Sequence, residues 1–358
     1  MIDNPVLRIA GLHKSFGDFN ALDSIDLDVS DGEFLAIVGP SGSGKTTLIR
    51  LLVGMDEPTE GTIWLRNKRI DNVPANRRPT CMVFQSLALF PHMTVGQNIE
   101  FPLKIRGVDA VNRRARALEL MSLLQLPDYY YDKRIAACSG GEKQRVALAR
   151  ALAFDPEILF FDEPLSALDY RLRKTLEKEL RELHRRTGKT FIYITHSLEE
   201  AMGMSDRIAI MKQGNFVQID SADTIYAHPV SRFVAGFMGE VNLFSVNNRD
   251  HSPCIEELNV SPRVINQLEL DDSRPATLVV RPENIRLPGN SGEGYEFKVD
   301  GQIQSEFNLG SRVQYEVKTE CAEPLIVEVF RENRLSNAIG SSVTLGWNLE
   351  HCHLITGE

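Results

Sequence analysis

The sequence Gly39-Pro40-Ser41-Gly42-Ser43-Gly44-Lys45-Thr46 decides the fold of the first part of the chain. Glycine, four further residues, glycine, lysine and threonine form the pattern of a phosphate-binding loop. An apolar run at residues 34–38 precedes it, as a buried strand would, and residues 45–53 can open a helix behind it. Backbone N–H groups of such a loop point at phosphate oxygens. We expect Lys45 to reach the β- and γ-phosphates and the Thr46 hydroxyl to bind Mg²⁺.

A second apolar run ends in two carboxylates, Ile158-Leu159-Phe160-Phe161-Asp162-Glu163. Carboxylates that leave the C-terminal end of a parallel strand face the ligand crevice of an α/β sheet. We therefore expect Asp162 to hold Mg²⁺, directly or through water, and Glu163 to polarise an attacking water. By itself the run is better explained as a solvated strand end, and the phosphate loop upstream favours the functional interpretation.

The chain has 358 residues, 42% of them hydrophobic and 25% charged, which allows two or three domains with their own cores. Up to about residue 240, short apolar runs alternate with helix-like stretches such as residues 170–187, a pattern typical of an α/β fold. Beyond it, short segments of alternating hydrophobicity predict a small all-β module. Residues 247–253 look like a linker or an exposed loop.

Composition and charge exclude several other classes of protein. No apolar run approaches the roughly 18 residues of a membrane span, and the first residues lack signal-peptide character, which predicts a cytoplasmic protein. Five scattered cysteines without a C-x-x-C pair argue against a disulfide framework or a Cys-rich zinc site. A net charge of −9 argues against bulk binding to nucleic acid or anionic lipid.

A third motif, Ser139-Gly140-Gly141-Glu142-Lys143-Gln144-Arg145, lies shortly before the acidic run. With all motifs in this order, the chain resembles the ATPase subunits of ATP-binding cassette (ABC) transporters over nearly its whole length. The resemblance implies an α/β P-loop ATPase domain at residues 1–240, with a helical subdomain at about 87–155. It implies an OB-like regulatory β-domain at 241–358. The implied cofactors are ATP and Mg²⁺.

The resemblance also implies roles for single residues. Phe16 would stack on adenine, although an ordinary hydrophobic strand residue is an open alternative. Gln85 would sense Mg²⁺ and link the core to the helical subdomain, and His196 would touch the γ-phosphate. The expected catalytic residues are Glu163, His196, Lys45 and Gln85, and the expected metal ligands are Thr46, Gln85 and Asp162. The expected nucleotide-binding residues are Phe16, Gly39, Pro40, Ser41, Gly42, Ser43, Gly44, Lys45, Thr46, Thr47, Gln85, Ser139, Gly140, Gly141, Glu142, Asp169 and His196.

Members of this family work as head-to-tail dimers, and a single phosphate loop in this chain predicts a homodimer. Ser139 to Gly141 of one chain would contact the γ-phosphate held by the other, and the loop that contains Asp169 would cross to the partner. Two departures stand out in the third motif: Glu142 replaces the usual Gln, and Cys138 replaces the usual Leu. A carboxylate adds negative charge near ATP and removes a donor, which predicts weaker binding or slower turnover. We expect Cys138 to be a packed small hydrophobe.

The helical subdomain and β-module resemble importer ATPases of the sugar, polyamine and ferric-ion branch. Residues 235–244 are close to the junction in spermidine/putrescine importer ATPases, which favours a polyamine cargo. The expected partners are two membrane permease subunits and, indirectly, an extracytoplasmic solute-binding protein, at the cytoplasmic face of the inner membrane. The alternatives are another cargo (sugar or ferric ion), a soluble cassette ATPase acting on ribosomes or DNA, and a P-loop small-molecule kinase. The acidic balance disfavours the soluble cassette, and the kinase leaves the third motif unexplained.

Overall fold

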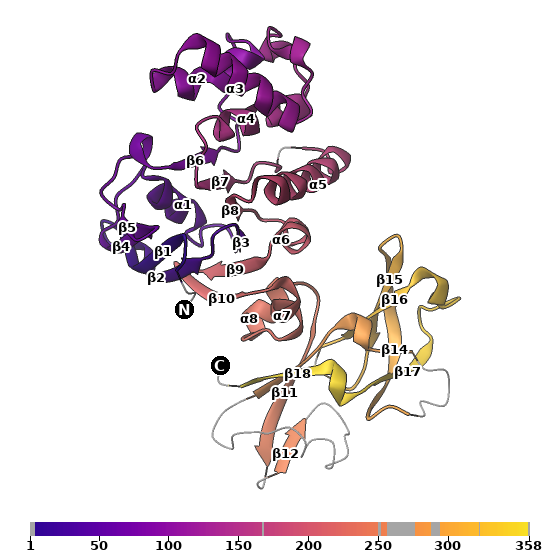
Figure 1. The fold of residues 1–358 in the computed structure, drawn as a ribbon. Helices are drawn as coiled ribbons and strands as arrows, with labels where there is room; N and C mark the ends of the chain where they lie inside the picture. The colour runs from indigo at the N-terminus through magenta and orange to yellow at the C-terminus, as the bar shows by residue number, and fades with distance from the viewer. Residues whose placement is uncertain are drawn as a thin grey trace. The chain divides into compact units, whose positions relative to one another are not determined.

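The computed structural model describes residues 4–166, 168–249, 252–255, 276–287, 294–321 and 323–356. The chain divides into two compact units, Met1–Ala222 and Asp223–Glu358. Figure 1 shows the first unit in indigo to rose and the second in salmon to yellow. Within the described residues, no helix is both long and apolar enough to cross a membrane.

The main sheet of the first unit has six strands in the order β10-β9-β3-β8-β7-β6. Its strands are β3 (Phe34–Val38), β6 (Thr80–Val83), β7 (Ile158–Asp162), β8 (Thr190–Ile194), β9 (Arg207–Lys212) and β10 (Asn215–Asp220). All pairs are parallel except that of β9 with β10. Every residue of β3 and β8 is buried. The apolar runs are thus confirmed as central strands, because strands covered on both faces need continuous apolar sequence.

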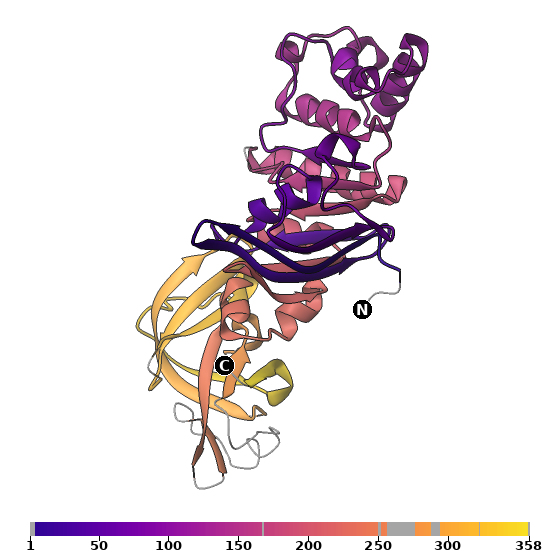
Figure 2. The ribbon, with the colours of Figure 1, turned by 90° about the vertical axis from the view of Figure 1, so that its left-hand side faces the viewer.

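A second sheet of the first unit is antiparallel, in the order β2-β1-β4-β5. It consists of β1 (Leu7–Phe16), β2 (Phe19–Val29), β4 (Glu60–Leu65) and β5 (Lys68–Arg69). Figure 2 shows these strands in indigo, running across the unit. Helix α1 (Lys45–Val53) shares one apolar core with residues of both sheets. Packing on both sides therefore fixes the helix that follows the phosphate loop.

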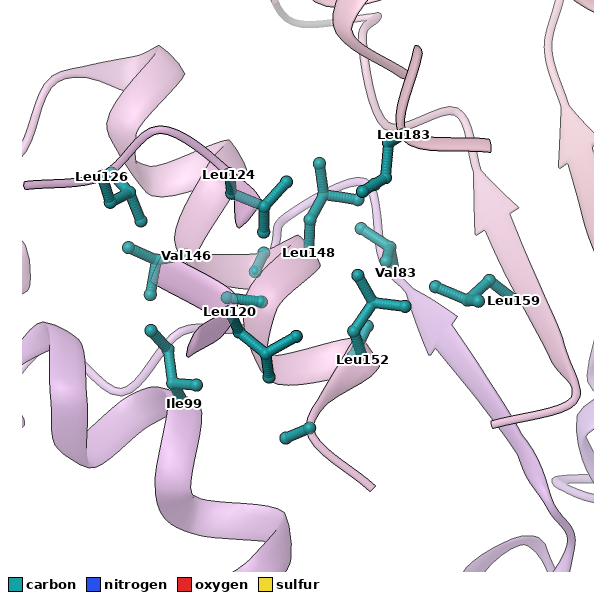
Figure 3. Packing of buried hydrophobic residues seen from close by; sticks show 14 of the residues in the cluster. Val83, Ile99, Leu120, Leu124, Leu126, Val146, Leu148, Leu152, Leu159 and Leu183 are labelled. Carbon is teal, nitrogen blue, oxygen red and sulfur yellow. The ribbon is translucent and has the colours of Figure 1, made fainter. Parts of the chain in front are cut away.

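Three helices form the part of the first unit inserted between β6 and β7, namely α2 (Val95–Ile105), α3 (Ala110–Leu123) and α4 (Gly140–Leu152). They lie within the range predicted for the helical subdomain. Figure 3 shows Ile99, Leu120 and Val146 from these helices in one cluster with Val83 of β6 and Leu159 of β7. Cys138 belongs to the same cluster, as expected of a small hydrophobe. The core of the helices is therefore continuous with that of the parallel sheet.

Two more helices pack beside the parallel sheet, and buried leucines of the longer one share a core with β3, β7 and β8. Helix α5 (Tyr170–Thr187) ends at Gly188, whose φ of 59° provides the left-handed residue that often terminates a helix. Leu176, Leu180 and Leu183 of α5 are buried, which confirms the predicted amphipathic helix. Helix α6 (Leu198–Met204) follows β8 after a short turn.

The second unit contains α7 (Ala222–Ala227), α8 (Arg232–Phe237) and two four-stranded sheets, β12-β11-β13-β18 and β16-β15-β14-β17. The strands are β11 (Asn242–Arg249), β12 (Ser252–Ile255), β13 (Ala276–Val280), β14 (Phe297–Asn308), β15 (Arg312–Lys318), β16 (Leu325–Phe330), β17 (Ser342–Trp347) and β18 (Cys352–Thr356). One apolar core joins both sheets, with Phe244 and Phe297 stacked on Trp347. The predicted all-β module is confirmed.

The prediction of a linker or an exposed loop at residues 247–253 is wrong for the residues that the structure describes. Strands β11 and β12 pair antiparallel there, with Asn247 opposite Cys254 and Arg249 opposite Ser252. Residues 250 and 251 lie outside the described residues. Turn residues such as Asn, Asp, Ser and Pro mark the tip of a hairpin as strongly as they mark a linker, and the sequence does not show where backbone pairing resumes.

The predicted domain boundary after residue 240 falls later than the division of the chain into units. The guanidinium of Arg281 is buried and donates to the carbonyls of Ala235 at 2.9 Å, Tyr226 at 3.0 Å and Glu240 at 3.3 Å. Ala235 also packs with Val279 of β13 in a small apolar cluster. These contacts attach α7 and α8 to the β-strands, because buried carbonyls need donors.

Arg281→Met should destabilise the second unit by about 2–4 kcal/mol, because buried carbonyls lose their charged donor. ATP binding should persist. Urea unfolding followed by the fluorescence of the fully buried Trp347 measures the effect. Arg312→Met is the matched control, since the Arg312 side chain is 56% exposed in its ion pair with Glu328. Equal losses for the two variants would contradict the role given to Arg281.

Candidate functional site

The phosphate loop forms one wall of a pocket of about 240 Å³ in the first unit. Glu163 from the end of β7 and His196 from the turn after β8 line the same pocket. The full lining is Phe19, Ala21, Ser41, Gly42, Ser43, Gly44, Lys45, Thr46, Thr47, Glu163 and His196. Parallel strands end at one edge of the sheet, which explains why loops distant in sequence meet here.

Two positions in the loop accept only glycine. Gly44 has a φ of 104°, and a Cβ placed on it would lie 2.7 Å from the carbonyl oxygen of Ala21. A Cβ on Gly39 would lie 2.2 Å from the carbonyl oxygen of Met211. Because both obstacles are backbone atoms, any side chain would push the loop away from its neighbouring strands.

The Lys45 ammonium is buried and bound to its own loop. Its Nζ donates to the carbonyl of Gly39 at 2.8 Å and to that of Pro40 at 2.9 Å. Burial lowers the pKa of Lys45, and the charges of Glu163 and Asp162 act in the opposite direction. A cation held by exchangeable carbonyl bonds beside the pocket can turn to phosphate oxygens without a change in the loop backbone.

Asp162 and Glu163 differ in environment although they are adjacent. Burial raises the pKa of Asp162, and the negative charge of Glu163 adds to this effect, whereas Lys45 and His196 oppose it. Glu163 has a φ of 46°, a left-handed conformation that is strained for a residue with a side chain. In this turn the Glu163 Oε1 lies 2.5 Å from the Nε2 of His196. The strained turn thus places a carboxylate and an imidazole together at the pocket wall.

Gln85 and Asp169 contact the surroundings of the site rather than line the pocket. The Nε2 of Gln85 donates to the Oγ of Ser166 at 3.0 Å, and this hydroxyl donates to the Glu163 carbonyl at 3.0 Å. Asp169 caps α5 by accepting from the backbone N–H of Leu172 at 3.0 Å. Ala167, in the loop expected to cross to the partner, lies outside the described residues.

The pocket has an aromatic residue, Phe19, that the sequence analysis did not single out. Phe16 and Phe19 pair across the β1–β2 hairpin, and Phe19 lines the pocket together with Ala21. Phe16 is 52% exposed, and its ring centroid lies 5.0 Å from the Nζ of Lys14. Stacking of Phe16 on adenine stays a prediction. Phe19 is the first residue of β2, and strand patterning in the sequence does not connect it with the loop.

Ser139 begins α4 with a reciprocal capping arrangement. Its Oγ accepts from the Glu142 N–H at 3.3 Å, and its own N–H donates to the Glu142 Oε2 at 2.9 Å. Ser139 and Gly140 are exposed. None of residues 139–142 lines the pocket. Within one chain, therefore, the phosphate loop and the third motif do not share a binding surface.

The carboxylate of Glu142 is not the bare charge that the sequence led us to expect. The Lys133 Nζ lies 2.8 Å from its Oε2, and the Tyr130 hydroxyl donates to its Oε1 at 3.0 Å. Lys133 lowers the pKa of Glu142, and the Ser139 N–H contributes in the same direction. The added negative charge has a cation of its own and faces back into the chain.

Lys133→Met should therefore impair the third motif only while Glu142 is present. We expect ATP hydrolysis at subsaturating ATP to fall about fivefold, because a carboxylate without its cation would then repel the phosphates that the family resemblance predicts at this motif. Adding Glu142→Gln to the same chain should restore it. Steady-state ATPase kinetics of both single variants and the double variant check this. If Lys133→Met costs as much activity in the Glu142→Gln background as in the wild-type background, the charge argument is wrong.

The donor set of the site suits a cation that arrives with phosphate. Among the described residues, no group of three or more His, Cys, Asp or Glu side chains could hold a metal by itself. The Thr46 residue is exposed at the pocket, and Asp162 ends the neighbouring strand. Mg²⁺ is commonly bound by one or two protein oxygens plus substrate phosphates and water, and these residues fit that arrangement.

Two family models match the chain. The model described as ABC transporter matches residues 22–166, and the model described as TOBE domain matches residues 278–355. The first match spans the phosphate loop, the third motif and the acidic strand. The second spans most of the β-module.

Relatives with known assignments are similar over nearly the whole chain. The spermidine/putrescine import ATP-binding protein PotA of Roseobacter denitrificans is 42% identical over 337 residues, which cover 92% of this chain and 90% of that protein. The protein of the same name from Pseudomonas aeruginosa is 39% identical over 367 residues, covering 98% of this chain and 99% of that protein. PotA of Thermotoga maritima is 40% identical over 333 residues, covering 91% and 90%.

Solved structures resemble the first part of the chain. The dimeric ATP-binding cassette MJ0796 in a post-hydrolysis state, bound to ADP and Pi, is 31% identical with a TM-score of 0.53, covering 60% of this chain and 98% of that one. CbiO1 from Clostridium perfringens, part of the ABC transporter complex cbiONQ, is 28% identical with a TM-score of 0.58, covering 63% and 92%.

Proposed function

The chain belongs to the ATP-hydrolysing subunits of ABC transporters, and from this membership we propose that it energises import of a polyamine such as spermidine or putrescine. The observation that supports a polyamine cargo is the extent of the sequence identity. The chain is 39% identical over 98% of its length to a spermidine/putrescine import protein. This similarity runs through both units, including the β-module. The alternatives of a sugar or ferric-ion cargo keep the same ATPase and change only the permeases.

The pocket supports a direct attack of water on the γ-phosphate. Lys45 would leave the carbonyls of Gly39 and Pro40 and bind β- and γ-phosphate oxygens, while the loop N–H groups bind the others. Glu163 would accept the proton of the attacking water. His196, 2.5 Å from Glu163, would touch the γ-phosphate and fix the carboxylate.

Mg²⁺ bound with ATP would neutralise phosphate charge. We assign Thr46 and Asp162 to hold it, since Thr46 lines the pocket and Asp162 ends β7 directly before Glu163. The Asp162 carboxylate is also poorly solvated. We assign Gln85 a role as a sensor, because its amide contacts Ser166 and through it the backbone of Glu163.

The working unit that we propose is a head-to-tail homodimer. Its support is the pocket itself, which contains no residue of the third motif, together with the dimeric state of the related MJ0796 cassette. The dimer would bind two permease subunits at the cytoplasmic face of the inner membrane, and through them an extracytoplasmic solute-binding protein. Nucleic acid has no part in this proposal, because the chain is acidic and the relatives described above are import proteins.

We propose a regulatory role for the β-module, separate from catalysis. Every residue that lines the pocket precedes residue 200. We assign catalysis to the predicted nucleotide-binding domain at 1–240 and regulation to the predicted β-domain at 241–358. Helices α7 and α8, which precede residue 240, belong almost entirely to the same compact unit as the β-strands.

Reconstitution tests the function directly. The chain would be combined in liposomes with candidate permeases and a candidate solute-binding protein from the same organism. Uptake of labelled putrescine, spermidine, maltose and ferric ion would then be compared. We expect ATP-dependent uptake of a polyamine and stimulation of ATPase activity by the loaded binding protein. If only the sugar or only ferric ion is taken up, the polyamine assignment is wrong and the assignment as an importer ATPase stands. ATPase activity that no permease affects would overturn the import function.

A further inference from the structure

The turn that carries His196 is held by a buried carboxylate. Thr195 and Glu200 are each 3% exposed. The Thr195 hydroxyl donates to the Glu200 Oε2 at 2.7 Å and accepts from the backbone N–H of Ser197 at 3.0 Å. Since Thr195 and Ser197 are the neighbours of His196 in the chain, these bonds restrain the turn on both sides of the imidazole.

The burial of the Glu200 carboxylate is costly unless its oxygens are paired. Its Oε2 also accepts from the Tyr193 hydroxyl at 2.8 Å, and its Oε1 lies 3.8 Å from the Nε of Arg173. The carboxylate thus combines two short hydrogen bonds on one oxygen with a longer charge contact on the other.

Arg173 extends this network to a second loop. Its guanidinium donates from Nη2 to the Leu168 carbonyl at 2.9 Å, inside the loop at residues 166–169. Its Nε is buried and has no hydrogen-bond partner among the described residues, although Glu200 is near. At 3.8 Å the ion pair is just beyond hydrogen-bond length, so a small shift of the loop would close it or open it further.

We propose that Thr195 and Glu200 are positioning residues for His196, and that Arg173 couples their position to the loop at 166–169. The inference rests on the proposed ATP hydrolysis. His196 meets Glu163 at 2.5 Å, and a displacement of about 1 Å at a catalytic group can cost about 10²-fold in rate. In the proposed dimer, the segment that contains Leu168 would face the partner chain. The network would therefore make the geometry of His196 depend on whether the partner is in place.

Thr195→Val tests the positioning role, because it keeps the shape of the side chain and removes the hydroxyl. We expect kcat for ATP to fall about 10- to 100-fold, with little change in the dissociation constant for ATP, since the phosphate loop is untouched. Thr195→Ser should restore kcat, because it returns the hydroxyl.

Thr190→Val is the matched control. Thr190 is fully buried at the other end of β8, where its hydroxyl accepts from the Gly32 N–H at 2.9 Å and donates to the Ser30 carbonyl at 3.5 Å. Both variants should lose thermal stability to a similar degree, and only Thr195→Val should lose kcat. Equal kcat losses, or none in Thr195→Val, would overturn the positioning role.

Arg173→Met tests the coupling and remains informative if Thr195→Val does not fold. We expect kcat to fall about tenfold with ATP binding unchanged. The double variant with Thr195→Val should fall no further than Thr195→Val alone, because Arg173 acts through that network. The coupling would be overturned if kcat of the double variant fell by the product of the two single losses, or if kcat of Arg173→Met equalled that of the wild type. If the wild-type chain does not hydrolyse Mg-ATP, the proposed function is refuted. If the wild-type and Thr195→Val chains hydrolyse ATP equally, only the positioning role is refuted.

Discussion

Glu163→Gln should reduce the rate of ATP hydrolysis by about 10²–10⁴-fold while ATP binding persists. The amide has nearly the shape of the carboxylate and cannot accept the proton of the attacking water. In the structure the Glu163 Oε1 lies at the pocket wall, 2.5 Å from the Nε2 of His196. None of the loop contacts of Lys45 involves the Glu163 side chain, so the phosphate-binding surface should remain.

The measurement pairs single-turnover hydrolysis with equilibrium binding of a fluorescent ATP analogue. Glu157→Gln is a suitable control, because it also removes one carboxylate charge. Glu157 forms an ion pair with Arg66 and does not line the pocket. Its hydrolysis rate should equal that of the wild type. If Glu163→Gln hydrolyses ATP as fast as the control, Glu163 is not the base.

Lys45→Ala should lower kcat/KM for ATP by about 10³-fold, the scale of losing one pre-organised charged donor at a phosphoryl group. In contrast to Glu163→Gln, this variant should also bind ATP more weakly, because Lys45 supplies the positive charge of the phosphate loop. The ammonium is buried and its present partners are two loop carbonyls, so no other cation of the pocket lining can replace it.

Isothermal titration with ATP and ATPase kinetics check this second prediction. Lys189→Ala serves as control, because Lys189 pairs with Asp155 at 2.9 Å and does not line the pocket. ATP affinity in Lys45→Ala that matches the control would show that the phosphates bind elsewhere.

The phosphate loop and its strands could be predicted because their sequence requirements are local. Gly39 and Gly44 are glycines since neighbouring backbone leaves no room for a Cβ, and such a requirement produces a fixed spacing. Strand β3 is buried at every residue and therefore reads as one apolar run. The predicted position of Glu163 follows from the rule that parallel strands end at one edge of the sheet. The role of His196 was implied by the family resemblance.

Other features depend on contacts that leave no periodic trace. Phe19 joins the pocket wall through a hairpin that folds back toward the loop, while its neighbour across the hairpin, Phe16, lies outside the wall. Lys133 neutralises Glu142 from a segment without regular structure. Arg281 is buried, and its charge suggested exposure. In each case a tertiary partner decides the role of the residue, and the partner is not marked in the sequence.

The central claim is that each ATP site is built from two chains. The structure supports it by keeping residues 139–142 of a chain away from the pocket of that chain. Two damaging changes mark the two halves of a site. Lys45→Ala removes a phosphate-binding charge, and Gly141→Asp puts a carboxylate where the γ-phosphate should lie. A Cβ at Gly141 would be 3.2 Å from the Cδ1 of Leu172, so Gly141→Ala controls for this steric effect.

The decisive measurement counts the ATP sites in two kinds of mixed dimer by equilibrium binding, with hydrolysis recorded alongside. Pairing a Lys45→Ala chain with a Gly141→Asp chain should leave one intact site, since both changes then fall in the other site. Pairing a wild-type chain with a chain that carries both changes should leave none, because each site receives one change. One intact site in the wild-type pairing and none in the other would contradict the account, because it is the pattern of sites built within single chains.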